Sequence, residues 1–416
     1  MVQDSHDSST AERRRAPGSL IIKPKKVIFY TVFVFAFLLS GTIVMLDVVP
    51  YRMNLIALLV IPLFFLYGIR FDRVLIAFAL LTAEILISAV VNEVTAAQLV
   101  LFLRSVLFAF LIYSLVRMFV KRDNIATIIR LCVLVGMVQL PIVLMQFMTY
   151  DSLPGRIREG MTLYRVDYSF GTFHFKGDAA MAFFLTLLVI FLLFDYKRNY
   201  IIRYKWFVAI WLTLTILISN AELMKLAIVI VWAAWAIRFL NIRTLIYATV
   251  ALALLAGVLY LSGVFDEIIA DFSRSFSSNL SASNAKTESF LTGGYGRGAA
   301  INYYLNNELE IIGDGPSKYY DVITRERTRG NYGHIFTYYS EVGLVGLFFS
   351  YLIFFLIAFP TRDGHMRIRG VAVLMCSILI LLSFTTEILA NISIVLIFSI
   401  IAMSYMIPEE RLFEQK

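Results

Sequence analysis

The sequence predicts an all-α polytopic membrane protein with about twelve transmembrane helices. Hydrophobic residues make up 60% of the 416-residue chain and charged residues only 16%, whereas soluble domains are about half apolar and a quarter charged. The mean hydropathy of +0.79 excludes a soluble globular fold. The net charge of +8 does not indicate nucleic-acid binding, because in a membrane protein the placement of charge matters more than its sum. The two cysteines, Cys132 and Cys376, lie inside apolar runs and imply no disulfide framework.

The first expected element is a polar, basic segment at 1–26, which we predict to be a disordered cytoplasmic tail. It resembles the start of a signal peptide. However, no small-residue cleavage site follows, and the first apolar run is long enough to span a membrane, so we expect that run to be retained. The expected spans are 27–48, 54–69, 74–92, 98–120, 125–149, 177–195, 201–219, 221–238, 244–263, 335–359, 370–387 and 389–407.

The placement of basic residues predicts the orientation of these spans. Connections that face the cytoplasm are enriched in Lys and Arg. If the amino terminus is cytoplasmic, the even-numbered connections are cytoplasmic too, and each of them contains Lys or Arg, whereas the short outer connections contain only Arg52. Both termini are therefore predicted to be cytoplasmic. The basic residues assigned to this side are Arg13, Arg14, Arg15, Lys23, Lys25, Lys26, Arg70, Arg73, Arg117, Lys121, Arg122, Lys197, Arg198, Arg203, Lys205, Arg238, Arg243, Arg362, Arg367, Arg369, Arg411 and Lys416.

Two outer connections are long, and long connections in compact proteins are usually functional or disordered. In the second, the Ser/Asn-rich stretch from Ser273 to Ser289 predicts flexibility, and the stretch from Arg297 to Leu309 predicts a short amphipathic helix before a Gly-rich turn. The expected organisation is a tail (1–26), nine helices with an outer loop at 150–176 (27–263), a large outer loop (264–334), three helices (335–407) and a cytoplasmic tail (408–416).

Ionisable residues within predicted spans are candidate functional residues because their burial in lipid is costly. Arg104 lies about two turns below the outer surface, with Glu84 and Glu93 as expected counter-ions. It is a candidate to bind an anion, and the alternative is an ion pair that joins two spans. Arg130 lies near the cytoplasmic end of its span, where a long side chain extends to the headgroups, so we favour a structural role.

Three further candidates lie where the chain returns to the membrane. Lys225 is expected at the outer interface, where it binds an anion or pairs with Glu222 one turn away. His174 and Lys176 precede the span at 177–195 and are candidate substrate contacts. The alternative for both is an ordinary interfacial residue.

His334, at the start of the tenth predicted span, is the main catalytic candidate. Tyr338 and Glu341 follow it by four and seven residues, so all three share one helix face. A histidine titrates near neutral pH and accepts a proton from a hydroxyl group.

Basic residues precede this face. Arg297 opens the amphipathic helix of the large loop, and arginines bind a pyrophosphate in two-pronged fashion. The alternative is an interfacial histidine beside arginines that bind lipid headgroups. A basic trio lies closer to His334, namely Arg325, Arg327 and Arg329.

The sequence lacks the motifs that are typical of metal binding, nucleotide binding and serine hydrolysis. The histidines show no tight spacing with Asp or Glu that predicts a metal site. There is no nucleotide-binding glycine loop and no G-x-S-x-G elbow, so ATP-driven transport and serine hydrolysis have no support. We expect no metal and no cofactor.

Four short elements follow one another in the second half of the chain. They are Gly171-x-Phe173 ending in Asp178, then Ser219–Asn220–Ala221–Glu222–Leu223–Met224–Lys225, then Arg297 with Ile312–Gly313–Asp314–Gly315, and finally His334 to Tyr338 with Glu341–Val342–Gly343–Leu344 and Gly346–Leu347. In this order they resemble the O-antigen ligase and O-antigen polymerase family of polysaccharide-assembly membrane proteins. Two residues depart from the family pattern, Ile335 where Asn is frequent and Lys225 near the usual arginine.

The resemblance covers about residues 170–350 and implies a GT-C-like, metal-independent glycosyltransferase of the bacterial inner membrane that acts on its periplasmic face. The implied donor is an undecaprenyl-pyrophosphate-linked oligosaccharide, the acceptor a glycan or lipid, and the partners membrane lipids, a chain-length regulator and a flippase. Fixed cations near the pyrophosphate lower the barrier as charge develops. The implied catalytic residues are His334, Arg297 and Glu341, and the implied substrate contacts are Lys225, Arg104, Lys176, His174, Arg329 and Tyr338.

Glu341 or Tyr338 is expected to orient His334, and the aromatic residues Phe173, Phe175 and Tyr338 are expected near the mouth of a groove for the lipid tail. Polymerisation of O-antigen, capsule or exopolysaccharide is the favoured activity. Ligation of the glycan to lipid A-core or another acceptor is the first alternative. A polysaccharide or lipid transporter or flippase is the second, although such proteins typically show inverted repeats and polar residues at the bilayer midplane.

Overall fold

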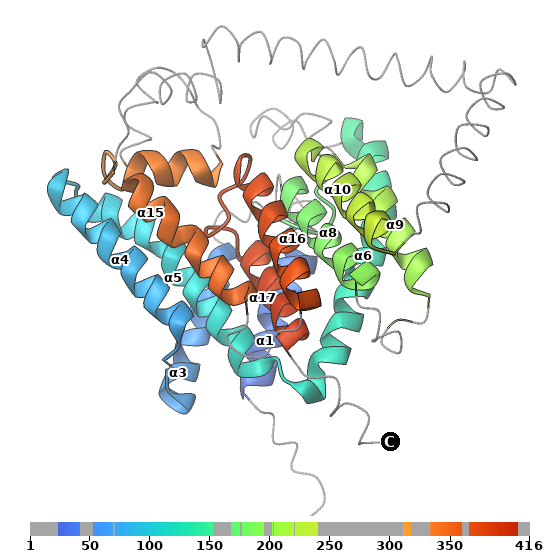
Figure 1. Ribbon diagram of the computed structural model, residues 1–416, viewed down its shortest axis with the longest axis horizontal. Helices are drawn as coiled ribbons and strands as arrows, with labels where there is room; N and C mark the ends of the chain where they lie inside the picture. The colour runs from blue at the N-terminus through green and yellow to red at the C-terminus, as the bar shows by residue number, and fades with distance from the viewer. Residues whose placement is uncertain are drawn as a thin grey trace, which may run out of the picture.

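The computed structural model describes residues 24–41, 53–69, 71–152, 168–174, 177–194, 202, 204–219, 221–239, 311–317, 333–359 and 366–406. Within these ranges the chain is predominantly helical and contains no strand (Figure 1). The elements are α1 (Pro24–Val34), η1 (Phe35–Leu39), η2 (Met53–Val60), α3 (Ile61–Tyr67), α4 (Arg73–Val91), α5 (Ala96–Phe119), α6 (Arg122–Thr149), η3 (Tyr150–Ser152), α8 (Asp178–Phe194), α9 (Lys205–Ile218), α10 (Glu222–Phe239), α15 (His334–Ala358), α16 (Met366–Ser383) and α17 (Ile392–Met406).

The all-helical prediction is confirmed for the described part of the chain. Every predicted apolar run has a helix there except 244–263, which lies outside the described residues. Four helices, α4, α5, α6 and α15, are long and apolar enough to cross a membrane. Many large apolar side chains are also exposed, among them Phe65, Phe71 and Val90, and exposed apolar surface of this extent is typical of contact with lipid. The chain is therefore a helical membrane protein, and the number of twelve spans stays a prediction.

Helices α8 and α17 occupy the centre of the bundle. Side chains are buried on all sides of both, over Ala180–Leu193 of α8 and over nearly all of α17. A helix that is apolar all round is stable only when other helices surround it. In Figure 1, α17 lies centrally between α15 and α5 on one side and α8 and α10 on the other.

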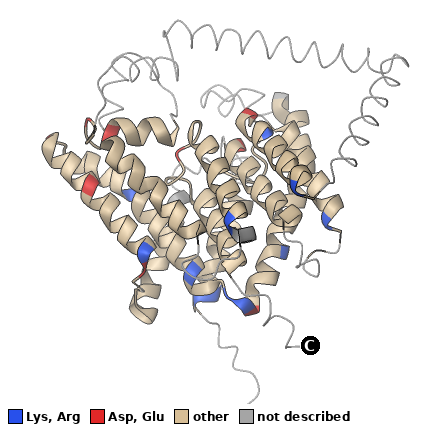
Figure 2. Cartoon of the chain, viewed as in Figure 1, with Lys and Arg blue, Asp and Glu red and all other residues tan. Residues whose placement is uncertain are grey.

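Contacts between helix ends show that most of the basic connections meet at one end of the bundle. Lys25 at the start of α1 lies over the ring of Tyr67 at the end of α3, with 5.3 Å to the ring centroid. Arg73 at the start of α4 donates a hydrogen bond of 3.4 Å to the carbonyl oxygen of Phe359, just after α15. We call this the basic end, and Figure 2 shows Lys and Arg concentrated there and Asp and Glu mostly at the opposite end.

The described part of the chain begins and finishes at the basic end. Ser393 at the start of α17 donates a hydrogen bond of 2.9 Å to the carbonyl oxygen of Ala36 in η1, which continues from the end of α1, so α1 and α17 run in opposite directions. Pro24 and Met406 therefore lie at the same end. The rings of Phe29 in α1 and Phe119 in α5 are 4.3 Å apart, which brings the end of α5 there too.

Candidate functional site

Helix α15 is broken at Gly343, at the end of the bundle opposite the basic end. Gly343 has φ 76° and ψ −172°, a backbone conformation that only glycine adopts without strain. Figure 1 shows the resulting bend between a short first part of α15 and its long second part. A break of this kind removes helical hydrogen bonds, and buried backbone groups need other partners.

The segment Ile311–Ser317 supplies these partners. Asp314 N–H donates to the carbonyl oxygen of Ser340 at 2.7 Å, and Gly315 N–H donates to that of Glu341 at 3.1 Å. Beyond the break, Val345 N–H donates to the carbonyl oxygen of Ile311 at 3.4 Å. The segment therefore completes the backbone hydrogen bonding that the bend interrupts.

The two backbones approach so closely that neither has room for a side chain. A Cβ atom on Gly313 would lie 2.5 Å from the backbone nitrogen of Gly343, and a Cβ atom on Gly343 would lie 2.1 Å from the carbonyl oxygen of Ile311. Helix α4 joins the contact, since Asn92 Nδ2 donates to the carbonyl oxygen of Gly313 and Ser88 Oγ to that of Glu341, both at 2.9 Å. The G-x-G and E-x-G elements, separate in the sequence, thus form one structural unit.

His334 lies inside the bend of α15 and is fully buried. Its Nε2 atom is 2.9 Å from Ser350 Oγ on the second part of α15, and its backbone N–H donates to the carbonyl oxygen of Thr386 at 3.2 Å. The ring lies 4.1 Å from that of Tyr338 and 5.6 Å from that of Tyr351. In the described part of the chain the buried Nδ1 atom has no hydrogen-bond partner.

Tyr338 and Glu341 share the buried face of α15, as the sequence spacing predicts. Tyr338 packs on Phe102 with ring centroids 5.1 Å apart, and its buried hydroxyl lies near the Ser105 side chain of α5. Glu341 Oε2 accepts a hydrogen bond of 2.7 Å from Ser317 N–H. Glu341 therefore holds the Ile311–Ser317 segment, whereas the hydrogen-bond partner of the His334 ring is Ser350.

Arg104 is an exposed residue in α5, and Glu387 is its electrostatic partner. Glu387 lies in the turn between α16 and α17, and its carboxylate also acts on Tyr338. Burial raises the pKa of Glu387 to about 7, and the nearby positive charge of Arg104 opposes that rise. Closeness in sequence favours Glu84 and Glu93 as counter-ions of Arg104. It gives no sign of Glu387, which is far from Arg104 along the chain although it ends a predicted apolar run.

The loop that contains Gly171 is held by two glutamines of α6. Gln146 accepts from Gly171 N–H and donates to the Gly171 carbonyl oxygen, both at 2.9 Å. Gln139 makes the equivalent pair of bonds with Thr172, accepting from its N–H and donating to its Oγ1, also at 2.9 Å. Both glutamines are fully buried. The predictions from sequence missed this pair, although two glutamines seven residues apart in an apolar run are a signal from which buried polar contacts could have been predicted.

The expectation that Phe173 and Tyr338 line the mouth of a lipid groove is wrong for this structure. Both side chains are fully buried, Phe173 against Phe37 and Phe184 and Tyr338 against Phe102. They are buried because the Gly171 loop and the bend of α15 turn inward between helices. Phe175 lies outside the described residues.

Of the remaining candidate residues, the structure describes Lys225, His174 and Arg130. Lys225 Nζ pairs with Glu222 Oε1 at 2.7 Å, the structural alternative for this residue. His174 is half-buried and Arg130 is exposed. Three candidates fall outside the described residues, namely Arg297, Arg329 and Lys176.

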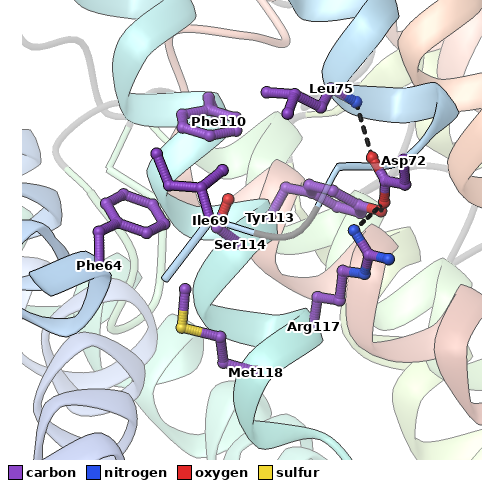
Figure 3. Close-up of a pocket in the computed structure, with 9 residues that line it drawn as sticks. All are labelled: Phe64, Ile69, Asp72, Leu75, Phe110, Tyr113, Ser114, Arg117 and Met118. Atoms are coloured by element: carbon purple, nitrogen blue, oxygen red, sulfur yellow. Dashed lines mark hydrogen bonds and ion pairs between the residues drawn. The ribbon is translucent and has the colours of Figure 1, made fainter. Parts of the chain in front are cut away.

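A separate pocket lies at the basic end, between α3, α4 and α5 (Figure 3). Asp72 caps α4 by accepting a hydrogen bond of 2.8 Å from Leu75 N–H, accepts another of 2.7 Å from the Tyr113 hydroxyl, and forms an ion pair with Arg117. Each of these contacts stabilises the start of α4. We assign this cluster a structural role.

The site at the bend thus combines a buried imidazole, an adjacent phenol and an acid, and Arg104 is linked to it through the charge of Glu387. The imidazole can accept a proton, and the arginine can bind an anion. No group of three or more His, Cys, Asp or Glu side chains in the described ranges could hold a metal ion. No protein-family model matches the chain, and a search of curated proteins gives no match.

Proposed function

We propose that this chain is a bacterial polysaccharide polymerase, a membrane glycosyltransferase that uses an undecaprenyl-pyrophosphate-linked oligosaccharide. One observation carries the proposal. The G-x-G and H…E-x-G elements, noted from sequence as separate parts of a family pattern, interlock at Gly313 and Gly343 next to a buried histidine. Contact between the two elements is what a shared site requires.

In the proposed reaction, a hydroxyl oxygen of the acceptor sugar attacks the anomeric carbon of the donor. Its proton passes to His334, and the bond between the anomeric carbon and the pyrophosphate oxygen breaks. Undecaprenyl pyrophosphate leaves with the bonding electrons. The donor thus carries its own leaving group, so the reaction needs neither ATP nor a nucleotide sugar.

Cations near the leaving group stabilise the charge that develops on the pyrophosphate. Arg104 is the described cation electrostatically linked to the bend, through Glu387. We propose that Arg297 and Lys225 contribute directly to this stabilisation. Further substrate contacts come from Lys176, His174 and Arg329.

We propose that the bend of α15 faces the periplasm and that both termini are cytoplasmic. Support comes from the basic end, which carries Lys25, Arg73 and the connection from α5 to α6 with Lys121 and Arg122, and which lies opposite the bend in Figure 1. Cytoplasmic ends of membrane proteins are enriched in such residues. The bacterial inner membrane is the corresponding location, because lipid-linked glycans are polymerised on its outer face.

Lipid products from a deletion strain distinguish polymerase from ligase. Loss of long chains, with a single repeat unit left on the acceptor, supports a polymerase. Free lipid-linked long polymer supports a ligase. Turnover of lipid-linked oligosaccharide by the purified protein in detergent excludes a transporter, because transport needs two compartments.

The mechanism is tested by His334→Ala in the complemented deletion strain. Removal of a general base lowers the rate by about 10²- to 10⁴-fold, so long polymer should be lost while protein abundance stays normal. The matched control is His365→Ala, in the predicted cytoplasmic connection between the spans 335–359 and 370–387, which should leave polymer unchanged. Full polymer from His334→Ala would refute the proposed mechanism.

A further inference from the structure

The hydroxyl group of Ser350 determines which nitrogen of the His334 ring carries the hydrogen. Ser350 Oγ lies 2.7 Å from the carbonyl oxygen of Leu347 and 2.9 Å from His334 Nε2. A carbonyl oxygen only accepts hydrogen bonds, so it takes the single hydroxyl hydrogen of Ser350. Ser350 Oγ then accepts from His334, which requires a hydrogen on Nε2. In the neutral ring, Nδ1 is therefore the acceptor.

The Nδ1 atom is buried and, within the described residues, has no hydrogen-bond partner. The ring of Tyr338 lies 4.1 Å from the ring of His334. Buried polar atoms in native proteins nearly always have a partner. The Nδ1 atom is such an exception, and it indicates a place where a ligand with a hydroxyl group completes the hydrogen bonding.

We infer that Ser350 is a positioning residue that keeps His334 in the tautomer whose Nδ1 accepts the proton of the acceptor hydroxyl. This inference rests on the proposed function. When the acceptor oxygen attacks the anomeric carbon, its proton moves to Nδ1 and the pyrophosphate leaves with the bonding electrons. His334 then carries hydrogen on both nitrogens, and Ser350 Oγ still accepts from Nε2. Ser350 thus stabilises the ring both before and after the transfer.

The structural half of the inference is tested without any substrate. The protein, labelled with ¹⁵N in its four histidines, is purified in detergent, and the His334 ring signals are assigned by their absence in His334→Gln. The expected spectrum shows hydrogen on Nε2 and an unprotonated Nδ1. Ser350→Ala should give a mixture of tautomers, whereas Ser350→Thr, which keeps the hydroxyl, should retain the original one. A wild-type ring with hydrogen on Nδ1 overturns the inference.

The proposed role of Ser350 in catalysis is tested in an activity assay, with lipid-linked oligosaccharide extracted from the deletion strain as the substrate. Loss of a partner for a buried donor corresponds to about a 10- to 100-fold effect, so Ser350→Ala should lower kcat by that factor with little change in KM. Ser350→Thr should recover most of the activity. The control is Ser404→Ala, because Ser404 is also buried and also donates to the carbonyl oxygen three residues earlier, at 2.6 Å, but lies in α17.

The two measurements separate failure of the inference from failure of the proposed function. If the tautomer changes in Ser350→Ala and kcat does not, Ser350 is not a positioning residue and the inference is refuted. If wild-type protein turns over no lipid-linked oligosaccharide, the proposed function fails, and the inference that depends on it fails as well. A fall in kcat with an unchanged tautomer also refutes the inference.

Discussion

Substitution of Gly343 by alanine should release the Ile311–Ser317 segment from α15. The new Cβ atom would lie 2.1 Å from the carbonyl oxygen of Ile311 and 2.6 Å from the backbone nitrogen of Ile312, so backbone must move. Movement breaks the three hydrogen bonds that join the segment to α15. At about 0.5–1.5 kcal/mol each, their loss amounts to roughly 1.5–4.5 kcal/mol. The unfavourable φ of alanine adds about 1–3 kcal/mol.

Gly68→Ala is a matched control, because it shares the backbone strain and lacks the clash. Gly68 has φ 70° and ψ 168°, close to the values of Gly343, and a Cβ atom there would have nothing within 4 Å. The difference in stability loss between Gly343→Ala and Gly68→Ala therefore measures the contribution of the close contact between the two backbones.

Hydrogen exchange followed by mass spectrometry gives the local measurement. In Gly343→Ala the amides of Asp314 and Gly315 should exchange about 10- to 10³-fold faster, the factor that corresponds to 1.5–4.5 kcal/mol. In Gly68→Ala their exchange should match the wild type. Unchanged exchange in 311–317 of Gly343→Ala would show that the interlock does not hold the segment.

Three other substitutions test the Gly171 loop, the buried carboxyl group of Glu387 and the ion pair of Lys225. Gln146→Leu leaves two buried backbone groups of Gly171 without partners, at about 1–3 kcal/mol each, and should lower Tm and speed exchange in 168–174; an unchanged Tm contradicts this. The folded-state pKa of Glu387, about 7, exceeds its ordinary 4.5, so its charged form opposes folding. Glu387→Gln should therefore raise Tm at about pH 8. Below about pH 4.5, where Glu387 is protonated in the folded and the unfolded state, the variant should have the Tm of the wild type. If the variant and the wild type have the same Tm at pH 8 as well, the assignment is refuted. Lys225→Met should change stability by less than about 1 kcal/mol, since its ion pair is near the surface; a larger loss by thermal unfolding argues for a structural role.

The helices and their ends were predictable from sequence because the signals are local. An apolar run predicts a helix from its own residues, and the described helices lie within a few residues of the predicted spans. The basic connections at 73, 121 and 122 also lie at one end of the bundle, because alternating helices return to the same end. The shared face of His334, Tyr338 and Glu341 follows from helical periodicity in the same way.

Hydrophobicity and helical period depend on neighbouring residues, so they were enough to predict a helical membrane protein and to place His334 on a polar helix face. The contacts of that face became visible only in the folded chain. Asn92 and Gly313, which meet at the bend, are 221 residues apart, and Ser350 contacts His334 only because α15 folds back at Gly343. Such contacts depend on how helices pack against one another, and no local pattern in the chain encodes them.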